Sequence, residues 1–193
     1  MAKYDVVIIG SGMGGLCCAY ILAKEGKRVC VLEKNRQIGG SLQIYSRDKT
    51  IFETGVHYIG GLDEGQNLNT FFNYFGLMKE LKLQKLDQNG YDLISFKDDE
   101  QVYPHQLAQL FPHERENLIT YIKKIKEVCA SFPLYNLSSE KKDVTAAWHL
   151  QIDSKSVINS IFKDPKLQQV IGGSNMLYAG LENKTPFYVH ALV

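Results

Sequence analysis

The sequence predicts an α/β fold that begins with a Rossmann-like βαβ unit and continues into a mixed, mainly helical α+β region. Three observations predict it. A short apolar run at 6–9 is followed directly by glycines, an amphipathic pattern of helical period covers 13–25, and a second apolar run at 28–33 ends on an acidic residue. Strand, tight turn, helix and strand within about 30 residues are typical of a unit that binds a dinucleotide.

The first strand is predicted at 6–9, where every residue is apolar and β-branched. A run without alternation is typical of a parallel strand that is covered on both faces. The helix after this strand is predicted to bury one apolar face, and Gly26 is expected to end it. That face is formed by Met13, Leu16, Cys17, Tyr20 and Ile21.

The glycines after the first strand fit the pattern GxGxxG, with Gly10, Gly12 and Gly15 at the defining positions. Gly10 is expected to allow the turn off the strand, Gly12 to let backbone approach a pyrophosphate, and Gly15 to let the helix pack close to the strand. The start of the helix offers unpaired N–H groups and a partial positive charge to the phosphates. Glu33, at the end of the second strand, can accept a hydrogen bond from a ribose 2′-hydroxyl, which favours FAD or NAD over NADP.

The remaining elements are predicted from turn residues and periodicity. A loop over 34–41 contains a glycine pair, a short strand covers 50–55, and the character of the chain changes near residue 62. Further elements are a β-hairpin made by 91–96 and 101–103 and helices over 66–83, 112–130, 138–150, 154–163 and 165–179. Asp153 or Ser154 is expected to cap the helix over 154–163, and Asp164 the helix over 165–179.

Composition narrows the function classes. The formal net charge is only +1, so no nucleic-acid partner is expected. The four cysteines and five histidines lack the spacing of metal ligands, so no metal is expected. We see no leader sequence and no apolar run of about 20 residues, so a cytoplasmic protein is expected, with peripheral membrane contact left open.

The segment DVVIIGSGMGGLCCAYILAKEGKRVCVLEKNRQIGGS closely resembles the start of the flavoprotein family that contains phytoene desaturases, retinol saturases and amine oxidases. FETGVHYIGG at 52–61 resembles the segment that reaches the flavin ring in that family. FPHERE at 111–116 and the stretch from Tyr178 to Ala191 resemble the retinol saturase and carotenoid desaturase branch. Many relatives carry arginine after the glycine pair, where this chain has Ser41, while Arg36 lies nearby.

The resemblance implies FAD as the cofactor and an N-terminal portion of a longer protein, incomplete relative to the family. Residues 1–62 would form the N-terminal part of the FAD-binding domain, and 63–193 a partial substrate domain. His57 and Tyr58 are the only candidates for a catalytic role. The implied cofactor-binding residues are Gly10, Ser11, Gly12, Met13, Gly14, Gly15, Glu33, Lys34, Arg36, Gly39, Gly40, Ser41, Gly55, Val56 and His57.

The resemblance further implies an FAD-dependent oxidoreductase that acts on the C–C bonds of a polyene or similar lipid, with hydride moving to or from flavin N5. Its substrate would be a hydrophobic small molecule, and a homo-oligomer would cover exposed edges. Two alternatives stay open: a flavin amine oxidase-like enzyme, and a non-catalytic fragment that binds flavin weakly or not at all.

Overall fold

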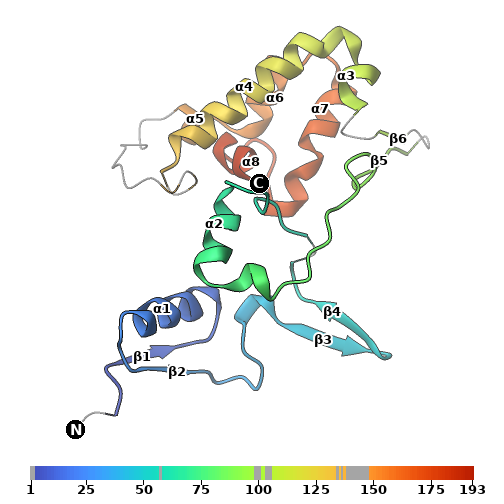
Figure 1. Ribbon diagram of the computed structural model, residues 1–193. Coiled ribbons are helices and arrows are strands. Elements are labelled where there is room, and N and C mark those ends of the chain that lie inside the picture. The colour runs from blue at the N-terminus through green and yellow to red at the C-terminus, as the bar shows by residue number, and fades with distance from the viewer. Residues whose placement is uncertain are drawn as a thin grey trace. The chain divides into compact units, whose positions relative to one another are not determined.

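The computed structural model describes residues 3–56, 58–97, 101–102, 106–133, 135, 137 and 148–193 (Figure 1). The chain divides into two compact units. Unit 1 is Met1–Leu81 and unit 2 is Lys82–Val193.

Unit 1 begins with the predicted βαβ arrangement. Strands β1 (Val6–Ile9) and β2 (Val29–Leu32) pair in parallel, with Val6 opposite Val29 and Ile9 opposite Leu32. Helix α1 (Met13–Lys24) connects them and ends where Gly26 adopts a φ of +81°, which glycine adopts without steric cost. The Rossmann-like start of the fold class is therefore confirmed.

The predicted burial of this unit was wrong in two respects. Val7 and Ile9 on β1 are 54% and 89% exposed, because α1 lies on one face of a sheet of only two strands. On α1, four of the five residues of the predicted apolar face are exposed, Met13 at 51%, while Cys17 is partly buried. Gly15 approaches Gly10 and Ile8 closely, so the helix meets the strand through this glycine.

A second element of unit 1 is the antiparallel hairpin of β3 (Ile44–Arg47) and β4 (Thr50–Glu53). Its two turn residues, Asp48 and Lys49, have φ of +50° and +65°, as a type I′ turn requires. The sequence predicts only the second strand, since Asp-Lys lacks the Asn-Gly or Asp-Gly signature of such a turn. All eight strand residues are exposed.

Helix α2 (Asn67–Tyr74) and the 3-10 turn η2 (Leu77–Lys79) complete unit 1. The single helix predicted over 66–83 was too long, because Gly76 adopts a φ of +73° and breaks it. The ring of Tyr20 on α1 meets the ring of Phe75 edge to face, with centroids 5.1 Å apart. Residues after 62 thus pack within unit 1, next to the βαβ arrangement.

Unit 2 is mainly helical, as predicted, with one small hairpin. Its elements are β5 (Ile94–Ser95), β6 (Gln101–Val102), α3 (Leu107–Leu110), η4 (Pro112–Glu114), α4 (Arg115–Ser131), α5 (Trp148–Gln151), α6 (Ser154–Ile161), α7 (Pro165–Gly172), η5 (Gly173–Tyr178) and α8 (Phe187–Leu192). The predicted hairpin is confirmed at β5 and β6. Most of the helix predicted over 138–150 lies outside the described residues, and α8 was not predicted.

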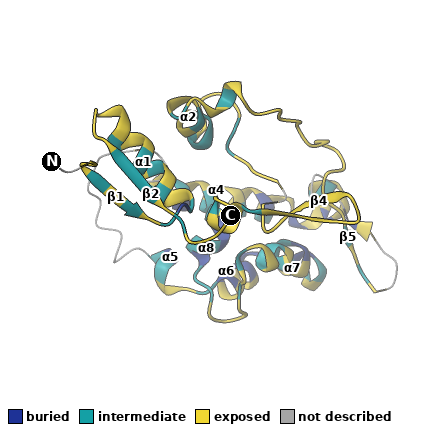
Figure 2. Ribbon diagram, turned by 90° about the horizontal axis from the view of Figure 1, so that it is seen from below, coloured by how far each residue is buried: buried dark blue, intermediate teal, exposed yellow. Residues whose placement is uncertain are grey.

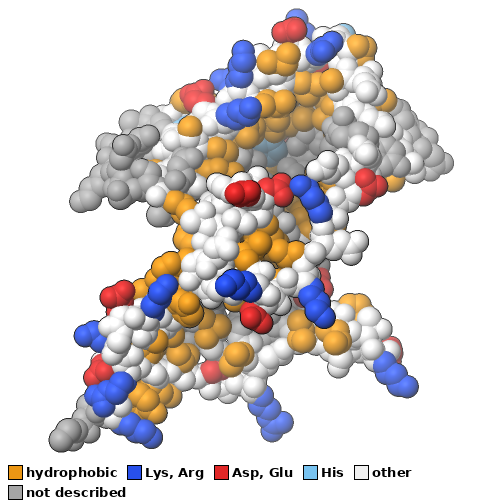
Figure 3. Space-filling model, viewed as in Figure 1, with side chains coloured by type: hydrophobic (Ala, Val, Ile, Leu, Met, Phe, Trp, Pro, Cys, Tyr) orange, Lys and Arg blue, Asp and Glu red, His pale blue; other side chains and the backbone are white. Residues whose placement is uncertain are grey.

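The hydrophobic core lies entirely in unit 2, as far as the described residues show. The largest of its members that are less than 2% exposed are Phe162, Phe187 and Leu167, and Figure 2 shows the dark buried segments on helices of this unit. The predicted caps are present, since Asp153 accepts from Ser156 N–H and Asp164 from the N–H groups of Lys166 and Leu167. In unit 1 the described hydrophobic residues reach the surface (Figure 3).

Candidate functional site

The glycine loop between β1 and α1 is held at the end of the parallel strands. Gly10 has a φ of +96°, and its N–H donates to the carbonyl of Leu32 over 2.7 Å. A Cβ on Gly15 would lie 2.3 Å from the carbonyl oxygen of Gly10, closer than any side chain tolerates. Gly10 therefore makes the turn and Gly15 brings the helix against it.

Gly12, by contrast, faces open space. A Cβ built there meets no heavy atom within 4 Å outside its chain neighbours, and its φ of −68° suits any residue. Gly12 is the N-cap of α1, and no side chain caps this end of the helix. The first turn also carries no acidic residue. Its N–H groups and the helix dipole therefore suit an anion, as the glycine motif predicts.

Glu33 is bound to the glycine loop. Its Oε2 accepts from the backbone N–H of Ser11 over 2.9 Å and from the Ser11 hydroxyl over 2.7 Å, while its Oε1 accepts from the N–H of Asn35 over 2.8 Å. Ser11 is 1% exposed and is the one buried residue described in unit 1. The pattern of glycines predicts neither the Ser11 nor the Asn35 contact.

These bonds keep the Glu33 carboxyl ionised. The N–H of Asn35, followed by the N–H and hydroxyl of Ser11, lowers its pKa from 4.5 to about 2. The N–H of Lys34 contributes to the lowered pKa as well. Glu33 is therefore an acceptor with a full negative charge, which suits a hydroxyl donor and disfavours a phosphate.

The glycine pair of the next loop closes onto the glycine motif. Gly39 N–H donates to the carbonyl of Ser11 over 3.0 Å, and the φ values of Gly39 and Gly40 are +110° and +60°. A Cβ on Gly40 would lie 2.9 Å from the Cα of Gly12. Both the backbone conformation and the close approach explain why glycine occupies these positions.

The structure gives fewer contacts for the remaining predicted site residues. Ser41 accepts at its carbonyl from the Thr54 hydroxyl over 2.8 Å, which brings the start of the 52–61 segment to the glycine pair. Lys34 and Arg36 are exposed loop side chains. Gly55 and Val56 come one residue after the end of β4, and Tyr58 is 55% exposed. His57 lies outside the described residues.

The FPHERE segment holds unit 2 together through a buried carboxylate. Glu114 is 1% exposed, and its Oε1 accepts from the N–H groups of Lys163 and Asp164 over 2.6 and 2.7 Å. Its Oε2 accepts from the amide of Asn117. Burial raises the pKa of Glu114, but these bonds outweigh burial, and the net pKa is lowered. Glu114 therefore ties the start of α4 to the residues that precede α7.

The Tyr178–Ala191 stretch contributes a buried histidine bridged by two tyrosines. Tyr178 donates its hydroxyl to Asn175 and so accepts from Nδ1 of His190 over 2.7 Å. Nε2 of His190 is then the acceptor for the Tyr121 hydroxyl at 2.6 Å. Burial lowers the pKa of His190 and raises that of Tyr121. The imidazole is held neutral as its Nδ1–H tautomer.

Comparison with known proteins agrees with the geometry of unit 1. The family model of the NAD(P)-binding Rossmann-like domain matches residues 8–75. The human all-trans-retinol 13,14-reductase is 36% identical over 140 residues, which are 68% of this chain and 23% of that protein. The chloroplastic prolycopene isomerase 1 of an Oncidium hybrid cultivar is 27% identical and covers 88% of this chain and 32% of its own length.

The chain is homologous to the retinol 13,14-reductases and prolycopene isomerases, as the sequence resemblance predicts. It spans about a quarter to a third of the length of these curated relatives. Among solved structures, a putrescine oxidase with a redesigned cofactor site superimposes with a TM-score of 0.67 at 17% identity, over 98% of this chain and 40% of that one. This likeness confirms the fold that the family resemblance implies.

Within the described ranges, no helix is both long and apolar enough to span a bilayer. The part of the chain that the structure describes also contains no group of three His, Cys, Asp or Glu arranged to hold a metal.

Proposed function

We propose that unit 1 holds the ADP half of FAD. The observation that carries this proposal is the junction of Ser11, Glu33 and Gly39, which fixes an ionised carboxylate beside an uncapped helix start. Glu33 would accept from a ribose hydroxyl, and the first turn of α1 would hold the pyrophosphate over the open side of Gly12. The charge of Glu33 suits a ribose hydroxyl, and the positive end of α1 and the open space at Gly12 suit a pyrophosphate.

The ionised Glu33 also bears on which dinucleotide binds. A 2′-phosphate on the ribose would meet a full negative charge, so NADP is disfavoured. The choice of FAD over NAD is supported by the family resemblance, since the glycine pair after the acidic residue is the feature that the resemblance associates with flavin. In this chain that pair lies against the glycine motif itself, with Gly40 next to Gly12.

We further propose that the protein is an oxidoreductase that acts on a C–C bond of a polyene or similar lipid. The name of the human relative states such a reaction, a reduction of all-trans-retinol at positions 13 and 14. When bound, the flavin supplies the hydride chemistry at N5. The chain's own part is to bind and orient the cofactor, and Tyr58, together with His57, remains the candidate for contact with the ring or the substrate.

The test is an absorbance spectrum of the purified chain, recorded before and after incubation with FAD and desalting. Retained flavin bands would support the proposal, and we expect NADP to leave the bands unchanged when added as a competitor. A bare protein spectrum would contradict flavin binding by this chain and would favour the alternative of a non-catalytic fragment.

A further inference from the structure

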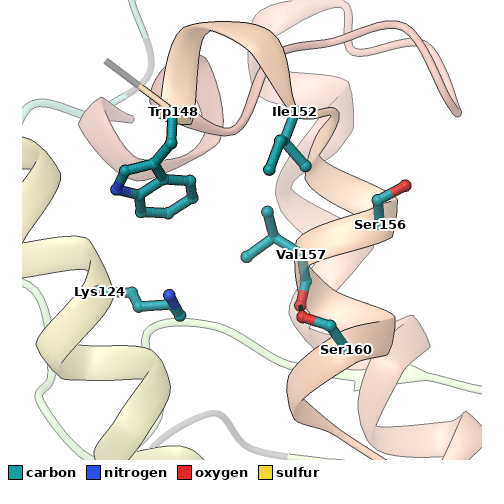
Figure 4. Close-up of a pocket in the computed structure, with 6 residues that line it drawn as sticks. All are labelled: Lys124, Trp148, Ile152, Ser156, Val157 and Ser160. Carbon is teal, nitrogen blue, oxygen red and sulfur yellow. Dashed lines mark hydrogen bonds between the residues drawn. The ribbon is translucent and has the colours of Figure 1, made fainter.

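A cleft of about 470 Å³ opens between α4, α5 and α6 of unit 2 (Figure 4). Its size falls within the roughly 300–1,000 Å³ that ligand sites usually occupy. It is lined by Lys124, Trp148, Ile152, Ser156, Val157 and Ser160. None of these residues belongs to the dinucleotide site.

Trp148 forms a rigid wall of this cleft. One face of its indole stacks on Phe187, with centroids 5.7 Å apart and an interplanar angle of 22°. Its Nε1–H donates to Glu127 over 3.0 Å, and the ammonium of Lys124 lies 4.5 Å from the ring centroid. Contacts on three sides fix the indole, so the wall is present before any ligand arrives.

Among the described residues that line the cleft, Lys124 is the one cation, and its ammonium lies over the Trp148 ring. No carboxylate of the described residues lies within 4.0 Å of this ammonium, and the nearby Glu127 accepts from the indole N–H. The side chain is half-buried, which weakens the screening of its charge by water. An anionic group placed here would gain a partner that the fold leaves open.

The rest of the lining limits the ligand to a single negative charge on an apolar body. The hydroxyls of Ser156 and Ser160 donate to Asp153 and to the carbonyl of Val157 over 2.6 and 2.7 Å, so they add no further donors for an anion. Figure 4 shows the side chains of Ile152 and Val157 directed toward the space in front of Trp148. This surface suits an aliphatic chain.

We propose that the cleft binds an amphipathic carboxylate, with its head on Lys124 and its alkyl chain against Ile152, Val157 and the edge of the Trp148 ring. A carboxylate matches one ammonium, whereas a phosphate monoester or a polyphosphate needs several donors, which the described lining does not offer. The site is separate from flavin binding, so its test does not depend on the proposed function.

Trp148 is the single tryptophan of the chain, so its fluorescence reports on this cleft alone. We would titrate the purified chain with octanoate, below its micelle concentration, and with octanol as the uncharged match. A saturable change in emission with octanoate, at a concentration at least about fivefold lower than with octanol, is expected from one partly shielded ion pair. The proposal would be overturned if octanoate and octanol changed the emission over the same concentration range. It would also be overturned if the response to octanoate did not saturate.

The variant Lys124→Met keeps the aliphatic stem and removes the charge. We expect it to weaken octanoate binding about fivefold and to leave the octanol response unchanged. Lys123→Met, an exposed neighbour on α4 outside the cleft, is the matched control and should titrate like the parent chain. Unchanged octanoate affinity in Lys124→Met would exclude the assigned head group position.

A second variant covers the case in which Lys124→Met does not fold, as judged by circular dichroism. Ser160→Leu, at an exposed position on the rim, fills the cleft without touching the charge. It should weaken octanoate and octanol together. Binding of both at parental strength would show that neither ligand occupies the cleft.

Discussion

Ser11 and Glu33 are joined twice, since both the backbone N–H and the hydroxyl of Ser11 donate to the same carboxylate oxygen, over 2.9 and 2.7 Å. The two residues are 22 positions apart and stand at the ends of the two parallel strands. Their contact fixes the glycine loop relative to the carboxylate that we propose binds the ribose. The loop is therefore shaped by the acidic residue before any cofactor is present.

Gly12 and Gly15 separate the two roles of the glycine motif, binding and folding. The Cβ of Gly12→Val meets no heavy atom within 4 Å beyond its chain neighbours, so we expect the thermal midpoint to stay within a few degrees while FAD retention is lost. Gly15→Ala places a Cβ 2.3 Å from the Gly10 carbonyl and should destabilise unit 1 by about 1–3 kcal/mol. Circular dichroism melts and flavin absorbance measure the two effects. Equal stability of the two variants would contradict the assignment.

Glu33→Arg should abolish FAD retention, because it replaces the ribose acceptor by a donor and removes the partner of Ser11. Ser11→Ala is the matched variant, since it removes one of three bonds to the carboxylate and keeps the backbone N–H. We expect it to retain flavin with lower affinity. Desalted flavin-to-protein ratios compare the two, and a Glu33→Arg protein with full flavin content would place the cofactor elsewhere.

The lowered pKa of Glu33 sets a pH window for that contact. A carboxyl whose pKa falls from 4.5 to about 2 on folding stabilises the fold fully above pH 4.5 and loses this contribution as the pH falls toward 2. FAD retention should therefore not titrate through Glu33 between pH 7 and 4.5. A midpoint near pH 6 that Glu33→Gln removes would contradict the structure.

Glu114→Gln should destabilise unit 2 by about 2 kcal/mol, the scale of hydrogen bonds to a buried charged group. The amide keeps one acceptor oxygen but turns its NH2 group toward backbone or Asn117 donors, so one contact becomes repulsive. Glu116→Gln is the control, because Glu116 is exposed in the first turn of the same helix. Urea unfolding followed by Trp148 fluorescence measures both variants, and a difference below about 0.5 kcal/mol would count against this structural role of Glu114.

The lowered pKa of His190 predicts that the fold loses stability at mildly acidic pH. Burial lowers its pKa below 6.5, so the folded state resists a proton that the unfolded chain accepts, and stability falls as the pH drops below 6.5. His149, whose pKa burial also lowers, acts in the same direction. The urea midpoint should drop between pH 7.5 and 5.5, and by less in His190→Gln.

Local sequence signals predicted the elements whose conformation is decided by neighbouring residues. The glycine motif, the strands around it and the caps at Asp153 and Asp164 are all found where periodicity and turn residues place them. The hairpin turn at Asp48 and Lys49 was missed, because its residues lack the usual preference for positive φ. The helix over 66–83 was overextended, because apolar spacing continued through Gly76.

The sequence by itself determined the βαβ unit, the dinucleotide fingerprint and the mainly helical character of the later part of the chain, since these depend on residues close along the chain. Only the tertiary structure showed that Ser11 engages Glu33, that Gly40 approaches Gly12, and that Tyr121, Tyr178 and His190 meet. It also showed that α1 meets β1 through Gly15, while most of the apolar face of the helix stays exposed. Contacts between residues distant in sequence depend on how elements pack, which the local pattern does not encode.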